Sequence, residues 1–390
     1  MSMERLCGSR QTRIFLGGLL WLAFLLLSGC ASQAALPHAH EIEHMLLIQA
    51  LGVDVGTAGV DGVAVSASSG ARPTAGDSPG QSPVVLSAQA DTVSAACAEM
   101  QTFGRDDVFY GDVEQLLVGE DQALRGLDGI LEHMARDQEL RLEAQAWVVR
   151  GTSASDALFA AAEGGGAAGR LSALQNDDKL FAYAVPRTAR EALVDLLDNG
   201  CTFLPALALE AARPGDGAEG ERELVQAGYA LFRDGALCGW AEGEAAWGMD
   251  LLLGEGAGEV LELVTPGQDR VALKISGVRT RLEPVFDGDR LTGLRVSCGL
   301  QADVMEFRGT GNLNDDTRAW LSEELGRVAQ RRLRAALEAM QTRNADVLHL
   351  KGRAALAAPW AQAALEEQWK AAFAELEVTV ETEGRVARRS

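Results

Sequence analysis

The chain has 390 residues, 47% of them hydrophobic and 23% charged, which is typical of a globular protein and excludes a disordered or fibrous one. Its 35 Lys and Arg residues and 56 Asp and Glu residues give a formal net charge of −21 at pH 7. This charge argues against nucleic acid as a partner, because a nucleic-acid-binding protein needs a basic surface to displace phosphate counterions, and anionic headgroups would repel the chain unless an anchor held it at a membrane.

The N-terminus has the pattern of a bacterial lipoprotein signal peptide. Three arginines precede an apolar run over residues 14–27, which is shorter than the roughly 20 residues that a spanning helix needs. The run ends in the lipobox sequence LSGC (27–30). We predict cleavage after residue 29 and attachment of the lipid to the Cys30 thiol; the alternative is an ordinary secretory signal followed by a chance cysteine.

Strands and helices are predicted to alternate over the first half of the mature chain. The periodicity predicts strands over 46–55, 113–118, 140–149 and 202–209. It predicts helices over 91–103, along the stripe Leu124, Leu127, Leu131 and Met134, from 153 to the glycines at 164–166, and over 188–197. The Gly-, Pro- and Ser-rich stretch 69–83 is expected to be a flexible surface excursion.

The polar segment 211–223 breaks the apolar pattern and is predicted to be a linker. A hairpin follows it, in which Asp234-Gly235 forms the turn. The remaining predicted elements are a helix over 245–253, strands over 258–264, 270–278, 279–287 and 291–307, the longest helix over 314–342, a helix beginning at Pro359, and a closing strand over 376–383. The long helix is expected to bury a core stripe of Leu325, Val328, Ala329, Leu333, Ala336, Leu337 and Met340. It is expected to expose Arg327, Arg331, Arg332 and Arg334, either to solvent or as a docking surface.

These elements predict a mixed α/β (α+β), multi-domain fold with mixed sheets, packed helices and a long C-terminal helix. The predicted boundaries are a signal peptide over 1–29, an N-terminal domain over 30–210, the linker over 211–223 and a C-terminal domain over 224–390. No apolar run after the signal peptide is long enough to span a bilayer.

The remaining cysteines are expected to be buried thiols. They are Cys97, Cys201, Cys238 and Cys298, which lie far apart and form no C-x-x-C motif, so the spacing indicates neither a zinc site nor a redox pair. A disulfide stays possible outside the cytoplasm.

One sequence matches a metal-binding motif. His40, Glu41 and His44 fit H-E-x-x-H, in which two histidines bind zinc and the glutamate acts as base. The match begins ten residues after Cys30 and has no sheet before it, so we interpret it as part of a tether; a third ligand would have to come from His133, His349 or a distant carboxylate.

Other candidate sites also have structural interpretations. Arg136, Asp137, Glu139 and Arg141 are expected to form a salt-bridge network, Asp54 to mark a strand end, and Trp240 and Trp247 to be core residues, although the two tryptophans could line a pocket. The chain has no G-x-S-x-G, P-loop or G-x-G-x-x-G motif. The sequence therefore predicts no catalytic residue, no metal and no cofactor.

Several segments together resemble the Ger(x)C family of spore germination lipoproteins, the C subunits of nutrient germinant receptors. The resemblance covers nearly the whole mature chain in order. It rests on the lipobox with Glu41-Ile42-Glu43 and ALGVDV (50–55), on 109–158, on FLPAL (203–207), on GYALFRDGALCGW (228–240), and on the helix from 314 with Pro359-Trp360, Trp369, Phe373 and the closing strand.

The resemblance implies a non-enzymatic subunit, lipid-anchored on the outer face of the cytoplasmic membrane, which in the spore is the inner membrane. It implies assembly with integral membrane subunits of a germinant receptor. Two alternatives stay open: a solute-binding lipoprotein of a transporter, and a lipid-anchored zinc metalloprotease using residues 40–44.

Overall fold

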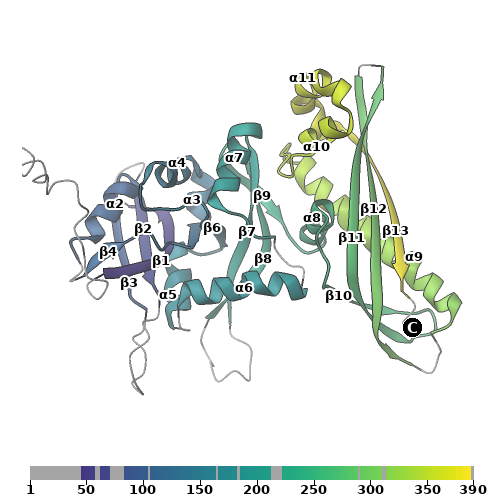
Figure 1. Ribbon diagram of the computed structural model, residues 1–390, viewed down its shortest axis with the longest axis horizontal. Coiled ribbons are helices and arrows are strands. Elements are labelled where there is room, and N and C mark those ends of the chain that lie inside the picture. Colours follow the sequence, from purple (N-terminus) through teal and green to yellow (C-terminus); the bar gives the residue numbers. More distant parts are fainter. Residues whose placement is uncertain are drawn as a thin grey trace, which may run out of the picture. The chain divides into compact units, whose positions relative to one another are not determined.

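The computed structural model describes residues 45–57, 62–70, 83–103, 106–163, 166–181, 185–211, 222–288, 290–309 and 313–387 (Figure 1). The predicted signal peptide, Cys30, the 40–44 motif and most of the segments 69–83 and 211–223 lie outside the described residues. The chain divides into two compact units, 1–45 and 46–390, and the elements below belong to the second apart from Met45.

A mixed sheet of nine strands forms the first part of this unit. The strand order is β3-β2-β1-β5-β6-β7-β8-β9, and β4 pairs with β1. The central neighbours β1, β5, β6 and β7 are parallel, whereas the outer pairs are antiparallel. The strands are β1 (Met45–Val55), β2 (Val63–Ser69), β3 (Val85–Ala90), β4 (Asp107–Phe109), β5 (Gln115–Gly119), β6 (Gln145–Arg150), β7 (Cys201–Ala211), β8 (Arg222–Arg233) and β9 (Ala236–Ala241).

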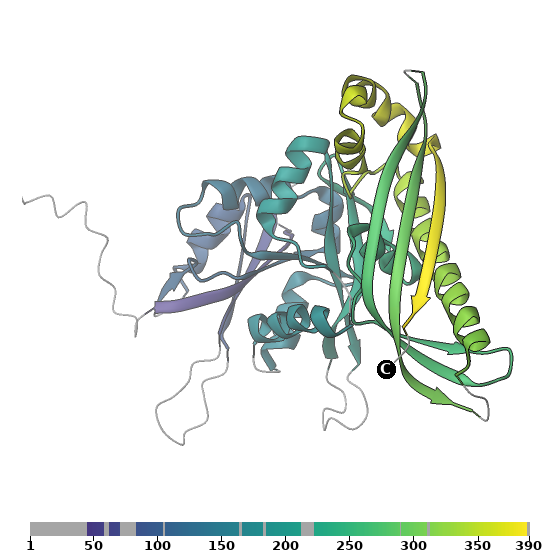
Figure 2. The ribbon, with the colours of Figure 1, turned by 45° about the vertical axis from the view of Figure 1, so that its right-hand side comes forward.

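Helices cover both faces of this sheet (Figures 1 and 2). One face packs against α2 (Val93–Met100), α3 (Glu120–Arg125), α4 (Asp128–Arg136) and α7 (Ala189–Asn199). The other face packs against α5 (Ala154–Glu163) and α6 (Ala167–Phe181). Parallel strands enclosed in this way are buried on both sides.

Two predictions about this sheet and its helices are wrong. The expected half-buried strand over 140–149 is β6, which begins only at Gln145 and is buried on both faces, because α5 covers the second face. The expected single helix after β5 is split into α3 and α4 at Gly126, whose φ of +138° favours glycine, and Leu124 is exposed. Helix α6 was not predicted, because its glycine- and alanine-rich start reads as a loop.

The hairpin β8–β9 extends the same sheet. Strand β8 pairs antiparallel with β7, so hydrogen bonding connects the strands on either side of the predicted linker. The predicted Asp234-Gly235 turn is confirmed, and both residues have positive φ.

A second sheet has the order β10-β11-β12-β13, with β13 parallel to β12. Its strands are β10 (Val260–Val264), β11 (Arg270–Asp287), β12 (Arg290–Arg308) and β13 (Glu377–Val386). The strands predicted over 270–278 and 279–287 are one strand, β11, whose register shifts between Ile275 and Gly277. The accompanying elements are α8 (Glu244–Leu253), α9 (Asp315–Gln341), α10 (Leu350–Ala357), η3 (Pro359–Ala361), α11 (Gln362–Ala372) and η4 (Phe373–Glu375). The predicted mixed α+β fold with a long C-terminal helix is confirmed.

Helix α9 lies against its neighbours at backbone contact distance. A Cβ atom on Gly248 of α8 would lie 1.9 Å from the Arg332 carbonyl oxygen, and one on Gly384 of β13 would lie 2.2 Å from the Ser322 carbonyl oxygen. The predicted core stripe of α9 is buried. The outer edge of β13 is also covered, since Gln330 donates to the Val380 carbonyl and Val386 N–H donates to the Ser322 hydroxyl.

Arg332 departs from the predicted exposed face of α9. Its side chain is only 6% exposed and binds Glu259 through two hydrogen bonds of 2.7 Å, and its guanidinium lies 5.0 Å from the centre of the Trp247 ring. Arg331 and Arg334 are exposed as expected. The exposed prediction was wrong for Arg332 because a helical pattern does not show that another element covers that position.

The four predicted thiols are free cysteines. Cys97, Cys201 and Cys298 are buried as predicted and Cys238 is half-buried, so the structure contains no disulfide among them. Trp240 is half-buried with the Arg150 guanidinium 5.1 Å from its ring centre.

Substitution of Gly248 tests the close approach of α8 and α9. Gly248→Ala should lower the free energy of unfolding by about 1–3 kcal/mol, because the added methyl overlaps the Arg332 carbonyl. Gly129→Ala is the matched control: a Cβ there meets nothing within 4 Å, so alanine should raise helix stability by up to about 1 kcal/mol. Urea unfolding of both variants measures the difference, and equal effects would contradict the packing.

Removal of Arg332 tests its buried ion pair. Arg332→Met should destabilise the chain by about 3–5 kcal/mol, because Glu259 would stay buried without its partner. Arg331→Met, on the exposed side of the same helix, should change the unfolding midpoint little. The double variant Arg332→Met/Glu259→Gln should recover part of the loss, and no recovery would contradict a pairwise origin.

Candidate functional site

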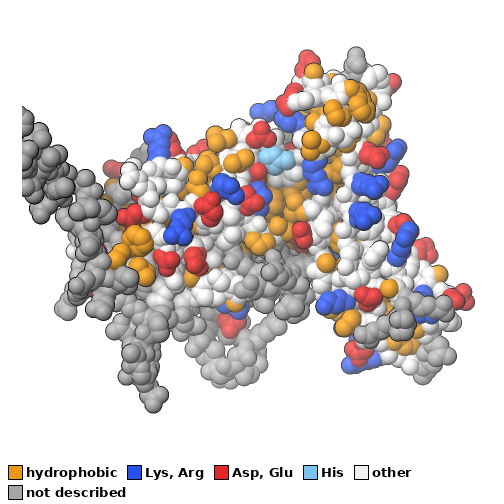
Figure 3. Space-filling model, in the orientation of Figure 1, with side chains coloured by type: hydrophobic (Ala, Val, Ile, Leu, Met, Phe, Trp, Pro, Cys, Tyr) orange, Lys and Arg blue, Asp and Glu red, His pale blue; other side chains and the backbone are white. Residues whose placement is uncertain are grey.

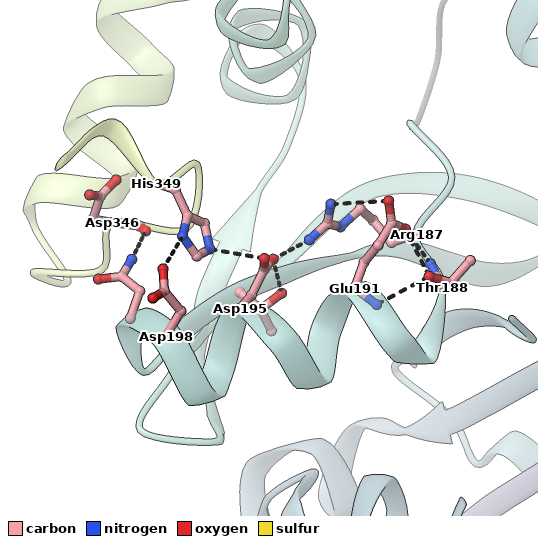
Figure 4. A network of polar contacts seen from close by, with 9 residues as sticks. Arg187, Thr188, Glu191, Asp195, Asp198, Asp346 and His349 are labelled. Atoms are coloured by element: carbon pink, nitrogen blue, oxygen red, sulfur yellow. Dashed lines mark hydrogen bonds and ion pairs between the residues drawn. The ribbon is translucent and has the colours of Figure 1, made fainter. Parts of the chain in front are cut away.

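The largest described network of polar contacts begins at helix α7 (Figure 4). A capping box starts the helix: the Thr188 hydroxyl accepts from Glu191 N–H at 3.1 Å, and the Glu191 carboxylate accepts from Thr188 N–H at 2.8 Å. Two turns later, Asp195 pairs with Arg187 and accepts from the Thr202 hydroxyl at 2.9 Å. Asp195 therefore connects the second half of α7 to β7.

His349 connects this network to the segment that follows α9. Its Nε2 atom lies 3.0 Å from Asp195 Oδ1, and its Nδ1 atom lies 3.7 Å from Asp198 Oδ2. Beside it, Asn199 Nδ2 donates to the Asp346 carbonyl at 2.7 Å. Residues about 150 positions apart in sequence thus meet at the C-terminal end of α7 (Figure 4).

The carboxylate of Asp346 fixes the start of α10 beside this contact. It accepts from Leu350 N–H at 2.7 Å and from Lys351 N–H at 2.9 Å, which caps the N-terminus of α10. Its burial raises the pKa of Asp346, although these two hydrogen bonds and His349 oppose the shift. The hydrogen bond to Asp195 raises the pKa of His349 against the effect of its own burial, so the charged imidazolium is favoured.

A second buried contact lies between β8 and α8. The Tyr229 hydroxyl donates to the carboxyl of Asp250, which is 2% exposed, and accepts from Val185 N–H at 2.6 Å. Burial is the main cause that raises the pKa of Asp250 to about 8. At neutral pH this aspartate is therefore mostly protonated.

Asp54 has the structural role that its sequence position indicates. It stands near the end of β1 and accepts from Ala154 N–H at 2.7 Å and from Ser155 N–H at 2.9 Å, so it caps α5. Burial raises its pKa, and the two backbone hydrogen bonds oppose that shift. The sequence does not reveal this partner, which lies 100 positions away.

A cavity of about 500 Å³ is lined by the N-terminus of α2, by α3 and by α4. On its wall Ser94 Oγ lies 2.9 Å from His133 Nδ1, and burial lowers the pKa of His133, so the ring is neutral. Asp137, the nearby acid, accepts instead from the backbone N–H groups of Glu139 and Leu140. The Ser94–His133 contact thus joins α2 to α4 without a carboxylate that orients the imidazole.

The expected salt-bridge network over 136–141 is only partly right. Arg136 pairs with Glu132 at 2.6 Å, whereas Glu139 accepts from Tyr110 N–H at 3.2 Å. The acids therefore bind backbone groups, because the α4–β6 connection leaves N–H groups that need acceptors.

The H-E-x-x-H match of His40, Glu41 and His44 lies outside the described residues, as does Cys30. The two possible third ligands have other partners: His133 contacts Ser94, and His349 contacts Asp195. Within the described part of the chain, no group of three or more His, Cys, Asp or Glu residues could hold a metal ion. No helix among these residues is long and apolar enough to cross a membrane.

Sequence reasoning missed Asp195, His349 and Asp250. A signal was present for Asp250, which is an acid within the apolar helix sequence 247–253, and the capping box marked the start of α7. No signal connects Asp195 with His349, because their proximity depends on the tertiary fold. All three side chains bind other groups of the chain, which suits positioning and not bond-making.

Charged side chains on the surface also pair with other groups of the chain. Acidic and basic side chains lie intermingled on the face shown in Figure 3, and several form local pairs, such as Arg327 with Glu323 at 2.8 Å and Lys351 with Glu366 at 3.0 Å. Exposed pairs of this kind contribute little to stability.

Asp250 should make stability depend on pH. Its pKa of about 8 in the folded chain exceeds the ordinary value of 3.8, so the folded state binds this proton more tightly than the unfolded state. The free energy of unfolding should therefore fall as the pH rises from about 4 to about 8. Asp250→Asn should reduce this slope in urea unfolding, whereas the exposed control Asp287→Asn should keep it; an unchanged slope in Asp250→Asn would contradict the assignment.

Two family models match the chain. The one described as "Spore germination protein N-terminal domain" matches residues 38–209, and the one described as "Spore germination B3/ GerAC like, C-terminal" matches residues 227–390. Among solved structures, the chain is similar to "Crystal Structure of the GerBC protein", with a TM-score of 0.55 and 13% identity over 87% of this chain and 97% of that chain, a likeness of fold. No curated protein matches it. The chain therefore belongs to the spore germination family of germinant receptor C subunits.

Proposed function

We propose that this chain is the lipid-anchored subunit of a germinant receptor, held through Cys30 on the outer face of the cytoplasmic membrane, which in the spore is the inner membrane. The observation that supports the proposal is the order of these features along the chain. The lipobox at residues 27–30 is followed by the regions that match the two spore germination models, 38–209 and 227–390. Family membership supports the receptor role, and the lipobox supports the attachment.

We further propose that the subunit acts by assembling with integral membrane subunits and catalyses no reaction. The described histidines and buried carboxylates support this, because they bind a hydroxyl, an imidazole or backbone N–H groups of the same chain. The proposed mature subunit has an N-terminal domain over 30–210 and a C-terminal domain over 224–390, joined at 211–223. The gap between the two matched regions supports a division here, whereas the pairing of β8 with β7 makes the hairpin β8–β9 part of the nine-stranded sheet.

Lipidation is tested by Cys30→Ala in the spore-forming host. The variant should leave the membrane fraction and slow nutrient-triggered germination by an order of magnitude or more, because soluble protein lacks the affinity that two acyl chains provide. Germination by a receptor-independent trigger should stay normal. Cys7→Ala, which changes a cysteine within the signal peptide, is the matched control and should behave as wild type.

Membrane localisation and full nutrient response in Cys30→Ala would overturn the anchor. Capture of the membrane subunits by the wild-type chain, solubilised in detergent, tests assembly separately. Zinc-dependent hydrolytic activity that is lost in Glu41→Ala would overturn the non-catalytic assignment, because in an H-E-x-x-H site the histidines bind the metal and the glutamate acts as base.

A further inference from the structure

Two sets of polar contacts connect the nine-stranded sheet and its helices with the end of α9. In the first, Arg233 Nη1 donates to the Arg343 carbonyl at 2.6 Å, and Arg343 Nε donates to the Cys238 carbonyl at 3.2 Å. In the second, His349 and the Asp346 carbonyl meet the C-terminal end of α7. The first set depends on arginine, which keeps its charge at all physiological pH values, whereas the second includes a histidine, which does not.

Three carboxylates raise the proton affinity of His349. Asp195 and Asp198 face it from α7, and Asp346 lies on its own segment. The neighbouring cations have other partners. Arg187 pairs with Asp195, Lys351 pairs with Glu366 at 3.0 Å, and Arg353 donates to the Leu252 carbonyl at 2.7 Å. A proton on the imidazole therefore supplies the positive charge that lies between these acids.

Loss of that proton changes what the ring can bind. The imidazolium has two N–H donors, one for each α7 carboxylate, but the neutral ring has a single donor. Asp195 would keep Arg187 and Thr202, and Asp198 is largely exposed to water, so neither needs the neutral ring. His349 also has a φ of +52°, a left-handed conformation that is unfavourable for a non-glycine residue and that its contacts must offset.

We propose that His349 is a proton-operated latch between helix α7 and the segment 346–349, closed while the imidazole is charged and released when it loses its proton. The hydrogen bond to Asp195 raises the pKa of His349, so the latch closes below the ordinary value of 6.5 and opens as the pH rises through the higher value. The arginine contacts and the hydrogen bond from Asn199 to the Asp346 carbonyl do not titrate, so opening frees His349 from α7 and leaves these contacts formed.

The test measures the distance between two spin labels, one at Leu197→Cys on α7 and one at Leu356→Cys on α10. Both positions are about 80% exposed. The labels are placed in the full chain, in which the half-buried Cys238 is replaced by Ala. Between roughly pH 5.5 and pH 8.5 the distribution should gain a longer or broader population, with a midpoint equal to that of the His349 NMR titration. His349→Gln should show this population at both pH values. His133→Gln, which changes the half-buried histidine on α4, should keep the wild-type response.

Identical distributions at both pH values in wild type, or an unchanged pH response in His349→Gln, would overturn the latch. If His349→Gln does not fold, Asp198→Asn gives an independent readout at a side chain that is 76% exposed. Removing this carboxylate should move the opening midpoint and the His349 titration together to lower pH. A shift of one without the other would also overturn the proposal.

Discussion

Helix α9 is the constraint on which the C-terminal sheet depends. It covers the edge of β13, contacts α8 at Gly248, and holds Arg332 against Glu259 in the interior. The close approach is possible only because glycines stand where the backbones meet. Arg332 is buried there, so the bidentate pairing with Glu259 is required to offset the cost of burying the charge.

Aspartates hold together elements that are far apart in sequence. Asp54 at the end of β1 caps α5, Asp346 caps α10, and Asp250 binds Tyr229 between α8 and β8. In each case one carboxyl satisfies donors that would otherwise be buried without a partner. An acidic chain can therefore build a specific interior, with the remaining acids left at the surface among arginines.

Several buried or half-buried titratable groups connect elements of the fold. Asp54 links β1 to α5, Asp195 links α7 to β7, and His133 links α4 to α2 on the wall of a cavity. A chain that transmits an interaction needs defined connections between its parts. The contact of α7 with the segment after α9 is such a connection, and its histidine makes it responsive to protons.

Much of the fold could be predicted from local pattern. The strands β1 and β7, the capping box at Thr188, the Asp234-Gly235 turn and the core stripe of α9 follow from hydrophobic period, cap and turn chemistry, which act over a few residues. The mixed α+β class and the family follow from the order of these elements. The split between α3 and α4 and the start of β6 could not be predicted in this way. The conformation of Gly126 and the burial of both faces of β6 depend on the elements packed around them.

By itself, the sequence determined the signal and lipobox pattern, the succession of strands and helices, and membership of the germination family, since each is carried by residues close together in the chain. Only the tertiary structure decided that Arg332 is buried, that Asp54 caps α5 across 100 positions, and that His349 lies 3.0 Å from Asp195. The physical reason is that charge pairing and desolvation depend on distance in space, and the local pattern of the chain does not encode which distant side chain a fold will bring within reach.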